Sequence, residues 1–179
     1  MKGATAELWV KINRRPTNAK KIIIAGDSAG GGLVLSVLLR IKQEGLPKPL
    51  GAYCLSPFTD LTFTGESRKN NRETDPMLAD SGGVWFFKEI YCKDKDTKNP
   101  LISHIFADFS ELSPILIQVS RSEILFDDAK RVYDRAKSQG VDIELQIWDD
   151  MPHVFQFFGL SESAEAIKKF KEFVQKLFS

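Results

Sequence analysis

The chain has 179 residues, 42% of them hydrophobic and 27% charged, which suits one globular domain or part of one and excludes long disorder, collagen-like repeats and coiled coils. Because 25 Lys and Arg stand against 24 Asp and Glu, the net charge of +1 supplies no field for nucleic-acid phosphates, and no nucleic-acid partner is expected. The longest apolar runs, residues 31–39 and 154–160, are too short to span a bilayer, so no integral membrane segment is expected.

Short apolar runs alternate with helix-like stretches along the chain, a pattern that predicts an α/β fold with a parallel sheet and crossover helices. Four strands are predicted at residues 22–25, 52–56, 115–119 and 143–148. Helices are predicted at residues 33–42, 84–92 and 127–138, with the end of another at 4–12 and a last one capped by Ser161. The run at 22–25 is continuous and apolar, so this strand is predicted to be buried on both faces. The last helix presents a predicted apolar stripe of Ile167, Phe170, Val174 and Leu177.

An irregular excursion, residues 57–114, follows the second strand. Glycines, prolines and asparagines interrupt it repeatedly, and only one helix is predicted within it. Insertions of this length between sheet elements are usually functional lids or caps. We therefore predict a cap-like segment within one domain.

The two cysteines, Cys54 and Cys92, have neither metal-site spacing nor the pattern of a disulfide framework, so no metal is expected. Residues 1–7 include a lysine but no unbroken apolar core, so no secretory signal is visible. Both features favour a reducing, cytoplasmic compartment.

The strongest local motif is Gly26-Asp27-Ser28-Ala29-Gly30, a G-x-S-x-G between a predicted strand and a predicted helix. A sharp strand-to-helix turn exposes such a serine, and the flanking Gly26 and Gly30 let neighbouring backbone pass close to it. Ser28 is thus the candidate nucleophile, and the Ala29 amide is the candidate donor to an oxyanion. The alternative is a glycine-rich helix start that binds phosphate or has no function.

A serine nucleophile needs a base, and the chain contains two histidines, His104 and His153. His153 follows the last predicted strand, in the Ser–acid–His order of elbow hydrolases, and is the candidate base. The alternative is a histidine that caps the final helix region. His104 lies within the excursion and is interpreted as a surface or lid histidine.

The acid should follow the third strand, where catalytic groups gather at the carboxyl ends of parallel strands. Glu123 is nearest that end and is the candidate acid. Asp127 and Asp128 fall in the first turn of the next predicted helix, where carboxylates commonly serve the helix dipole. Asp127 is the reserve acid. The chosen carboxylate would hold His153 in one tautomer and stabilise its charged form.

Taken together, these motifs resemble the hormone-sensitive-lipase-like carboxylesterases of the α/β-hydrolase fold, in their C-terminal portion. The resemblance rests mainly on four segments, residues 25–31, 56–62, 123–128 and 151–155, with Asp75-Pro76-Met77 as a further match. It implies a Ser28–Glu123–His153 triad that hydrolyses carboxylic esters through an acyl-enzyme, without a cofactor. It also implies that Asp27 supports the elbow and that the excursion carries part of a cap.

The family places an H-G-G-G segment upstream of the elbow, which supplies further oxyanion amides, and no such segment occurs here. The resemblance therefore implies an N-terminally truncated sheet of about four strands, with residues 1–179 forming a single partial domain. The nucleophile strand would then become an open sheet edge. The alternative function is a truncated or split fragment without catalysis, perhaps completed by a partner chain or an oligomer.

Overall fold

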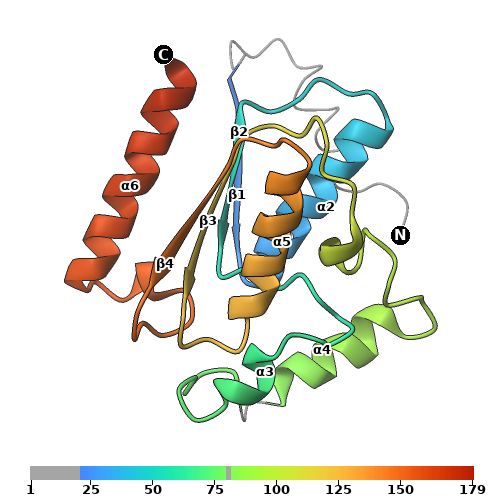
Figure 1. Ribbon diagram of the computed structural model, residues 1–179, viewed down its shortest axis with the longest axis vertical. Coiled ribbons are helices and arrows are strands. Elements are labelled where there is room, and N and C mark those ends of the chain that lie inside the picture. Colours follow the sequence, from blue (N-terminus) through green and yellow to red (C-terminus); the bar gives the residue numbers. More distant parts are fainter. Residues whose placement is uncertain (1–20, 80–81) are drawn as a thin grey trace.

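The computed structural model describes residues 21–79 and 82–179 of the chain, and its elements alternate between strands and helices (Figure 1). The strands are β1 (Ile23–Asp27), β2 (Gly51–Leu55), β3 (Ile115–Ser120) and β4 (Ile143–Trp148). The α-helices are α2 (Ala29–Gln43), α3 (Ser67–Asn70), α4 (Gly83–Cys92), α5 (Phe126–Ser138) and α6 (Ser161–Phe178). Two 3₁₀ turns are η1 (His104–Phe106) and η2 (Phe155–Phe157). The predicted helix end at 4–12 lies outside the described residues.

The four strands form one parallel sheet in the order β1-β2-β3-β4, which confirms the predicted fold class. The register pairs Gly26 with Cys54, and Cys54 with Ile117. Because the strands are parallel, their carboxyl ends meet at one edge, and the segments that follow β1, β3 and β4 meet there as well.

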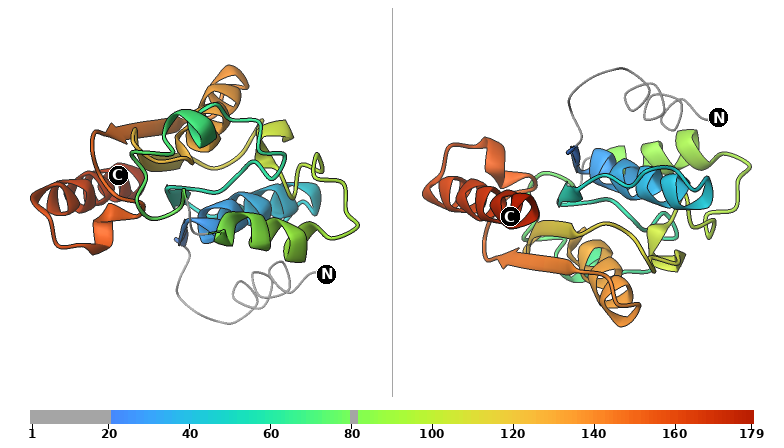
Figure 2. Two further views of the ribbon diagram at one scale, coloured as in Figure 1. Left: turned by 90° about the horizontal axis from the view of Figure 1, so that it is seen from below. Right: turned by 90° about the horizontal axis from the view of Figure 1, so that it is seen from above.

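Helices cover both faces of the sheet, with α2 and α5 on one face and α6 on the other (Figures 1 and 2). The alternation of side chains along β2 shows how the sequence achieves this. Ala52 and Cys54 pack with the α2 and α5 core, whereas Tyr53 and Leu55 pack with Phe173 of α6. Both faces of β2 and β3 are therefore buried, as their continuous apolar runs predict.

Strand β1 corrects one prediction, because it is not buried on both faces. Ala25 and Asp27 are exposed, and the rest of the strand is half-buried. Among the described strands β1 pairs only with β2, so it forms one edge of the sheet. An apolar run therefore identified the strand correctly but not its position, because sequence periodicity does not reveal the number of neighbouring strands.

Helix α6 corrects two further predictions. Its N-terminal flanking residue is Leu160, whose N–H donates to Ser163 Oγ at 3.2 Å, so Ser161 opens the helix rather than capping it. The buried side also differs from the predicted stripe: Ile167 is 53% exposed, while Phe173 is buried. Phe170 packs on Tyr53 with ring centroids 4.2 Å apart.

The excursion lies across the carboxyl ends of the strands and carries α3, α4 and η1 (Figure 1). Buried Asp128 of α5 anchors its first part, since its Oδ2 accepts hydrogen bonds from Thr59 N at 2.9 Å and Asp60 N at 2.8 Å. Arg68 pairs with the same carboxylate at 2.9 Å. Burial raises the pKa of Asp128 to about 6, and Arg68 is the strongest opposing influence.

His104 is a core residue, which corrects its interpretation as a surface or lid histidine. It is 3% exposed, and its Nε2 lies 2.7 Å from Ser36 Oγ on α2. Since that hydroxyl donates to Leu101 O at 3.1 Å, the histidine is the donor in the pair. Burial lowers the pKa of His104 to about 3, so the folded protein holds the ring neutral.

This buried ring makes stability depend on pH. The pKa of His104 is about 3 in the fold and about 6.5 in the unfolded chain, so its contribution is complete above about 6.5 and is lost as the pH falls towards 3. His104→Gln retains a donor to Ser36 and should reduce the loss of unfolding free energy between about pH 7.5 and 4.5 by about 2–3 kcal/mol. Urea unfolding at both pH values measures this effect. Asp128 acts in the opposite direction but is common to both proteins, so an equal loss in both would contradict the assignment.

Candidate active site

Ser28 lies between β1 and α2 in a backbone conformation that L residues rarely adopt, with φ 53° and ψ −121°. Both of its backbone polar groups are fixed by the chain that follows β2. Its N–H donates to Leu55 O at 2.8 Å, and its carbonyl accepts from Phe58 N at 2.9 Å. These bonds hold the strained turn that the G-x-S-x-G motif predicts. Ala29 opens α2, so its N–H belongs to the first turn, where amides have no intrahelical acceptor.

The glycines around Ser28 have unequal roles. A Cβ at Gly26 would lie 2.4 Å from Gly30 O, and one at Gly32 would lie 2.3 Å from Phe58 O. A Cβ at Gly31 would lie 2.8 Å from Pro57. At Gly30 itself an added Cβ meets no described atom within 4 Å. Side-chain space therefore requires glycine at the first position of the motif, and Gly31 and Gly32 share this role.

Glu123 and His153 form a buried pair at the ends of β3 and β4. Glu123 is 1% exposed, and its Oε2 lies 2.6 Å from His153 Nδ1. Its Oε1 accepts hydrogen bonds from Ser56 Oγ at 2.6 Å and Ser120 N at 2.8 Å. Because an ionised carboxylate only accepts hydrogen bonds, the imidazole proton lies on Nδ1 and leaves Nε2 free to act as a base.

Ser56 joins the acid to the histidine loop, a role that the sequence analysis did not assign. Its hydroxyl donates to Glu123 and accepts from Val154 N at 3.4 Å. Ser56 and Val154 both have positive φ, 42° and 50°, like Ser28. Backbone strain in folded proteins concentrates at functional sites, where the surroundings must hold it in place. The signal in the sequence is the Ser56–Thr62 segment, which is part of the family resemblance.

The excursion fixes the loop that carries Glu123. Asn71 Nδ2 donates to Glu123 O at 2.7 Å, and Asp75 Oδ2 accepts from Ile124 N at 2.9 Å. Asp75 belongs to the Asp75-Pro76-Met77 segment, whose structural role the sequence did not reveal. The excursion therefore sets the backbone position of the acid as well as covering the strand ends.

The remaining predicted residues lie apart from this pair. Asp127, the reserve acid, accepts from Ser67 N at 2.8 Å and so binds α3 to α5. Asp27 is exposed at the end of β1. The hydrogen bonds of the described residues do not include one between Ser28 and His153. The structure thus brings Glu123 and His153 into contact and places Ser28 on the elbow, without joining all three.

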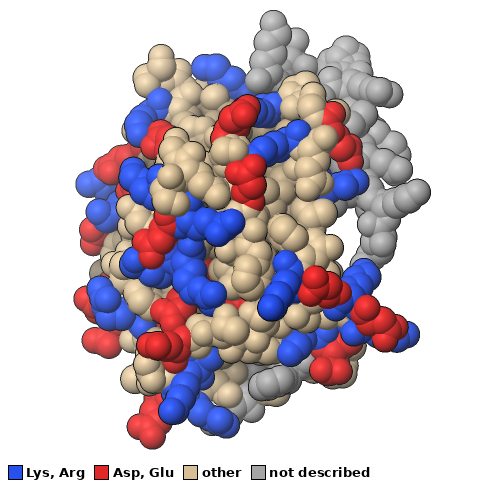
Figure 3. All heavy atoms as spheres, turned by 45° about the vertical axis from the view of Figure 1, so that its right-hand side comes forward, with Lys and Arg blue, Asp and Glu red and all other residues tan. Residues whose placement is uncertain are grey.

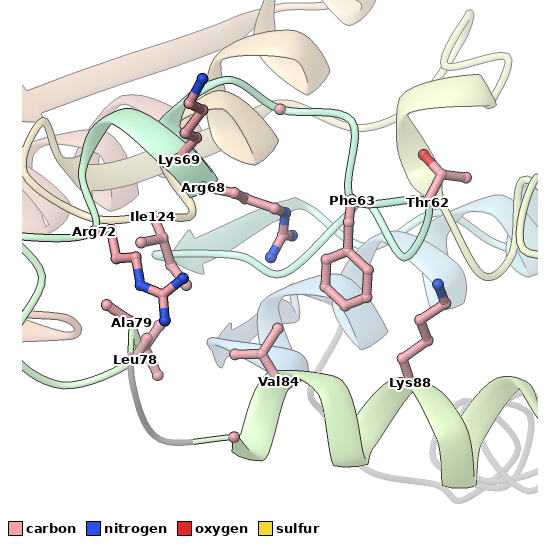
Figure 4. Close-up of a pocket in the computed structure, with 12 residues that line it drawn as sticks. Thr62, Phe63, Arg68, Lys69, Arg72, Leu78, Ala79, Val84, Lys88 and Ile124 are labelled. Atoms are coloured by element: carbon pink, nitrogen blue, oxygen red, sulfur yellow. The ribbon is translucent and has the colours of Figure 1, made fainter.

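Two of the cavities beside these residues adjoin the start of α2 and the loop that carries Glu123. One, of about 200 Å³, is mainly apolar and begins at Ala29 and Gly30 next to the elbow. The other, of about 580 Å³, reaches Ile124, the neighbour of Glu123, and is lined by the excursion (Figure 4).

Within the described part of the chain, no three His, Cys, Asp or Glu side chains cluster as metal ligands do. No described helix is both long enough and apolar enough to cross a membrane.

A strained serine between a parallel strand and a helix is the elbow geometry of the α/β-hydrolase fold. The comparisons agree, since the profile of the α/β hydrolase fold family matches residues 2–157. The chain therefore belongs to this family, and its structural neighbours make it a hormone-sensitive-lipase-like member.

A hormone-sensitive lipase from a metagenome library has 40% identity and a TM-score of 0.88, with 96% of this chain and 59% of that chain covered. An esterase of Acinetobacter venetianus is 35% identical over 88% of this chain and 53% of its own length. An acetyl-hydrolase of Streptomyces hygroscopicus is 34% identical, with 83% and 50% covered. The chain thus spans about half the length of the curated relatives it matches.

The glycine geometry predicts opposite outcomes for two similar substitutions. Gly26→Ala should lower the free energy of unfolding by at least about 2 kcal/mol, because its Cβ would overlap the Gly30 backbone. Gly30→Ala is the matched control: it has open space and lies in a helix, where alanine is favoured over glycine by about 1 kcal/mol. Urea unfolding compares the two, and equal destabilisation would contradict this account of the elbow.

Proposed function

We propose that this chain carries the catalytic residues of a carboxylic ester hydrolase that works through an acyl-enzyme. Ser28 attacks the acyl carbonyl while His153 accepts its proton, and Glu123 orients and stabilises the charged imidazole. His153 then delivers the proton to the leaving alcohol and activates a water for deacylation. The Ala29 amide donates to the oxyanion. The chemistry needs no cofactor.

The observation that carries this proposal is the buried Glu123–His153 pair, with 2.6 Å between Oε2 and Nδ1. A carboxylate buried against an imidazole adds little to stability, because desolvation offsets most of its attraction. A function that needs an oriented imidazole accounts for it better. The names of the relatives, esterase and acetyl-hydrolase, support the same reaction class. The apolar cavity next to Ala29 and Gly30 has room for a short acyl chain.

A second candidate is a fragment without activity of its own, completed by a partner chain or an oligomer along the β1 edge. The exposed residues of β1 and the span of the relatives favour it. A strand edge offers unpaired N–H and C=O groups to another strand.

The free, buried Cys54 and Cys92 support the expected reducing, cytoplasmic compartment.

A nucleic-acid partner remains disfavoured. Figure 3 shows Lys and Arg interspersed with Asp and Glu over the face in view, without a continuous field of one sign. Phosphate backbones are bound by such fields.

A fluorophosphonate probe tests the nucleophile without requiring turnover. The probe should label the chain covalently, and Ser28→Ala should abolish labelling, because the probe reacts only with an activated serine. Ser161→Ala is the control, since that serine is exposed at the start of α6. Gel fluorescence or intact mass measures the label. Equal labelling of the Ser28 variant would remove this residue as nucleophile.

Two isosteric changes test which carboxylate is the acid. Glu123→Gln should slow both probe labelling and hydrolysis of p-nitrophenyl butyrate by roughly 10²–10⁴-fold, because the imidazole loses its oriented partner. Asp127→Asn should change both rates by no more than about threefold, because Asp127 contacts Ser67 rather than the imidazole. Circular dichroism checks the folding of both variants. The reverse ranking would transfer the acid role to Asp127.

A further inference from the structure

The larger cavity, about 580 Å³, lies between α4 and the part of the excursion that carries α3 (Figure 4). Its lining includes Ile124, the residue after Glu123. Ser67 Oγ donates to Ile124 O at 2.8 Å, so α3 is fastened to the same loop as the acid. The cavity therefore adjoins the candidate active site, at the sheet edge where ligands of parallel α/β proteins bind.

Among the described residues of this lining, the charged ones are all cationic. The described lining residues include Arg68, Lys69, Arg72 and Lys88 and no carboxylate. In Figure 4, Lys69 points away from the cavity, whereas the Arg68 and Lys88 side chains extend towards Phe63 inside it. A mainly one-sign lining in a partly enclosed space attracts ligands of opposite charge.

The Arg68 guanidinium is not fully hydrogen-bonded within the described chain. Its side chain is 10% exposed, and its Nη2 donates to Asp128 and to Asp60 O. Its Nε is buried and has no hydrogen-bond partner among the described residues. A guanidinium presents five donors in a rigid fork, so the bond to Asp128 leaves part of the fork for a second anion. A buried donor without an acceptor is unfavourable, so a shift of the guanidinium that brings this donor to an anionic oxygen in the cavity would be favourable.

Lys88 brings a second cation to the same aromatic ring. The Arg68 guanidinium lies 4.5 Å from the Phe63 centroid, and Lys88 Nζ lies 4.9 Å from it. One ring attracts both cations, but the cations repel each other. Figure 4 shows the Phe63 ring between the two cations, so an anionic group beside the ring would be attracted by both.

We propose that this cavity holds an anionic group of the substrate, a carboxylate or a phosphate, remote from the ester bond. The site would then prefer esters that carry negative charge over neutral esters of the same size. The charge preference rests on the proposed function, whereas the binding of anions by the cavity does not.

Binding is tested first, because it requires no catalysis. Isothermal titration calorimetry of the whole chain with glutarate, and separately with inorganic phosphate, should give saturable binding to at least one. The tighter ligand identifies the preferred anion. Lys88→Gln should weaken that binding about tenfold or more, because a hydrogen-bonded charge is lost. Arg68→Lys keeps a cation beside Asp128 but removes the fork, and should weaken it similarly.

Lys130→Gln is the matched control, since it makes the same charge change on the exposed side of α5, where Lys130 pairs with Asp134. It should leave the affinity unchanged. Absence of saturable binding by the unmodified chain, or equal weakening by Lys88→Gln and Lys130→Gln, would overturn the inference.

Hydrolysis separates this inference from the proposed function. The chain should cleave the p-nitrophenyl hemiester of glutaric acid with a higher kcat/KM than p-nitrophenyl butyrate. Lys88→Gln should lower the ratio of these two kcat/KM values about tenfold. Cleavage of the neutral ester without any preference would reject the charge selectivity alone. Failure to cleave either ester, with Lys88-dependent anion binding intact, would reject the proposed function and leave the anion site standing.

Discussion

The strained backbone of Ser28 is the constraint on which the site depends. A turn with φ 53° persists only if its surroundings hold it, and here the chain after β2 does so through Leu55 O and Phe58 N. The same crossing requires Gly31 and Gly32, since Pro57 and the Phe58 carbonyl occupy the space of their side chains, while Gly26 is required by the Gly30 backbone within the elbow. The conformation of Ser28 therefore depends on the packing of β1, the start of α2 and the segment after β2, rather than on the motif alone.

A second constraint links the other two candidate residues to that crossing. Ser56 lies at the end of β2, just before the segment that holds Ser28, and its hydroxyl contacts both Glu123 and the backbone of Val154. The end of β2 thus supports the elbow on one side and the acid–histidine pair on the other. The excursion completes this arrangement, because Asn71 and Asp75 fix the loop that carries Glu123.

The sequence predicted the four parallel strands and the pairing of Glu123 with His153, because these depend on local signals. A strand–elbow–helix unit is recognised from a short sequence motif. Parallel strands end at one edge of the sheet, so residues that follow them come close together. The local patterns did not show that His104 is buried or that β1 is an edge, although the family resemblance implied the open edge. Both features depend on partners distant in sequence: His104 bonds Ser36 of α2, and the number of strands beside β1 is not encoded in its own apolar run.

Two largely buried charged residues near the carboxyl ends of the strands, Glu123 and Arg68, differ in how fully they are hydrogen-bonded. Glu123 is buried with three hydrogen-bond partners, so its charge is fully used within the protein. Arg68 is almost as buried, yet its Nε has no partner in the described chain. Buried charges are normally satisfied, because desolvation is otherwise uncompensated. One side of the acid loop is therefore complete as folded, whereas on the other side the proposed anion would supply the acceptors that Arg68 lacks.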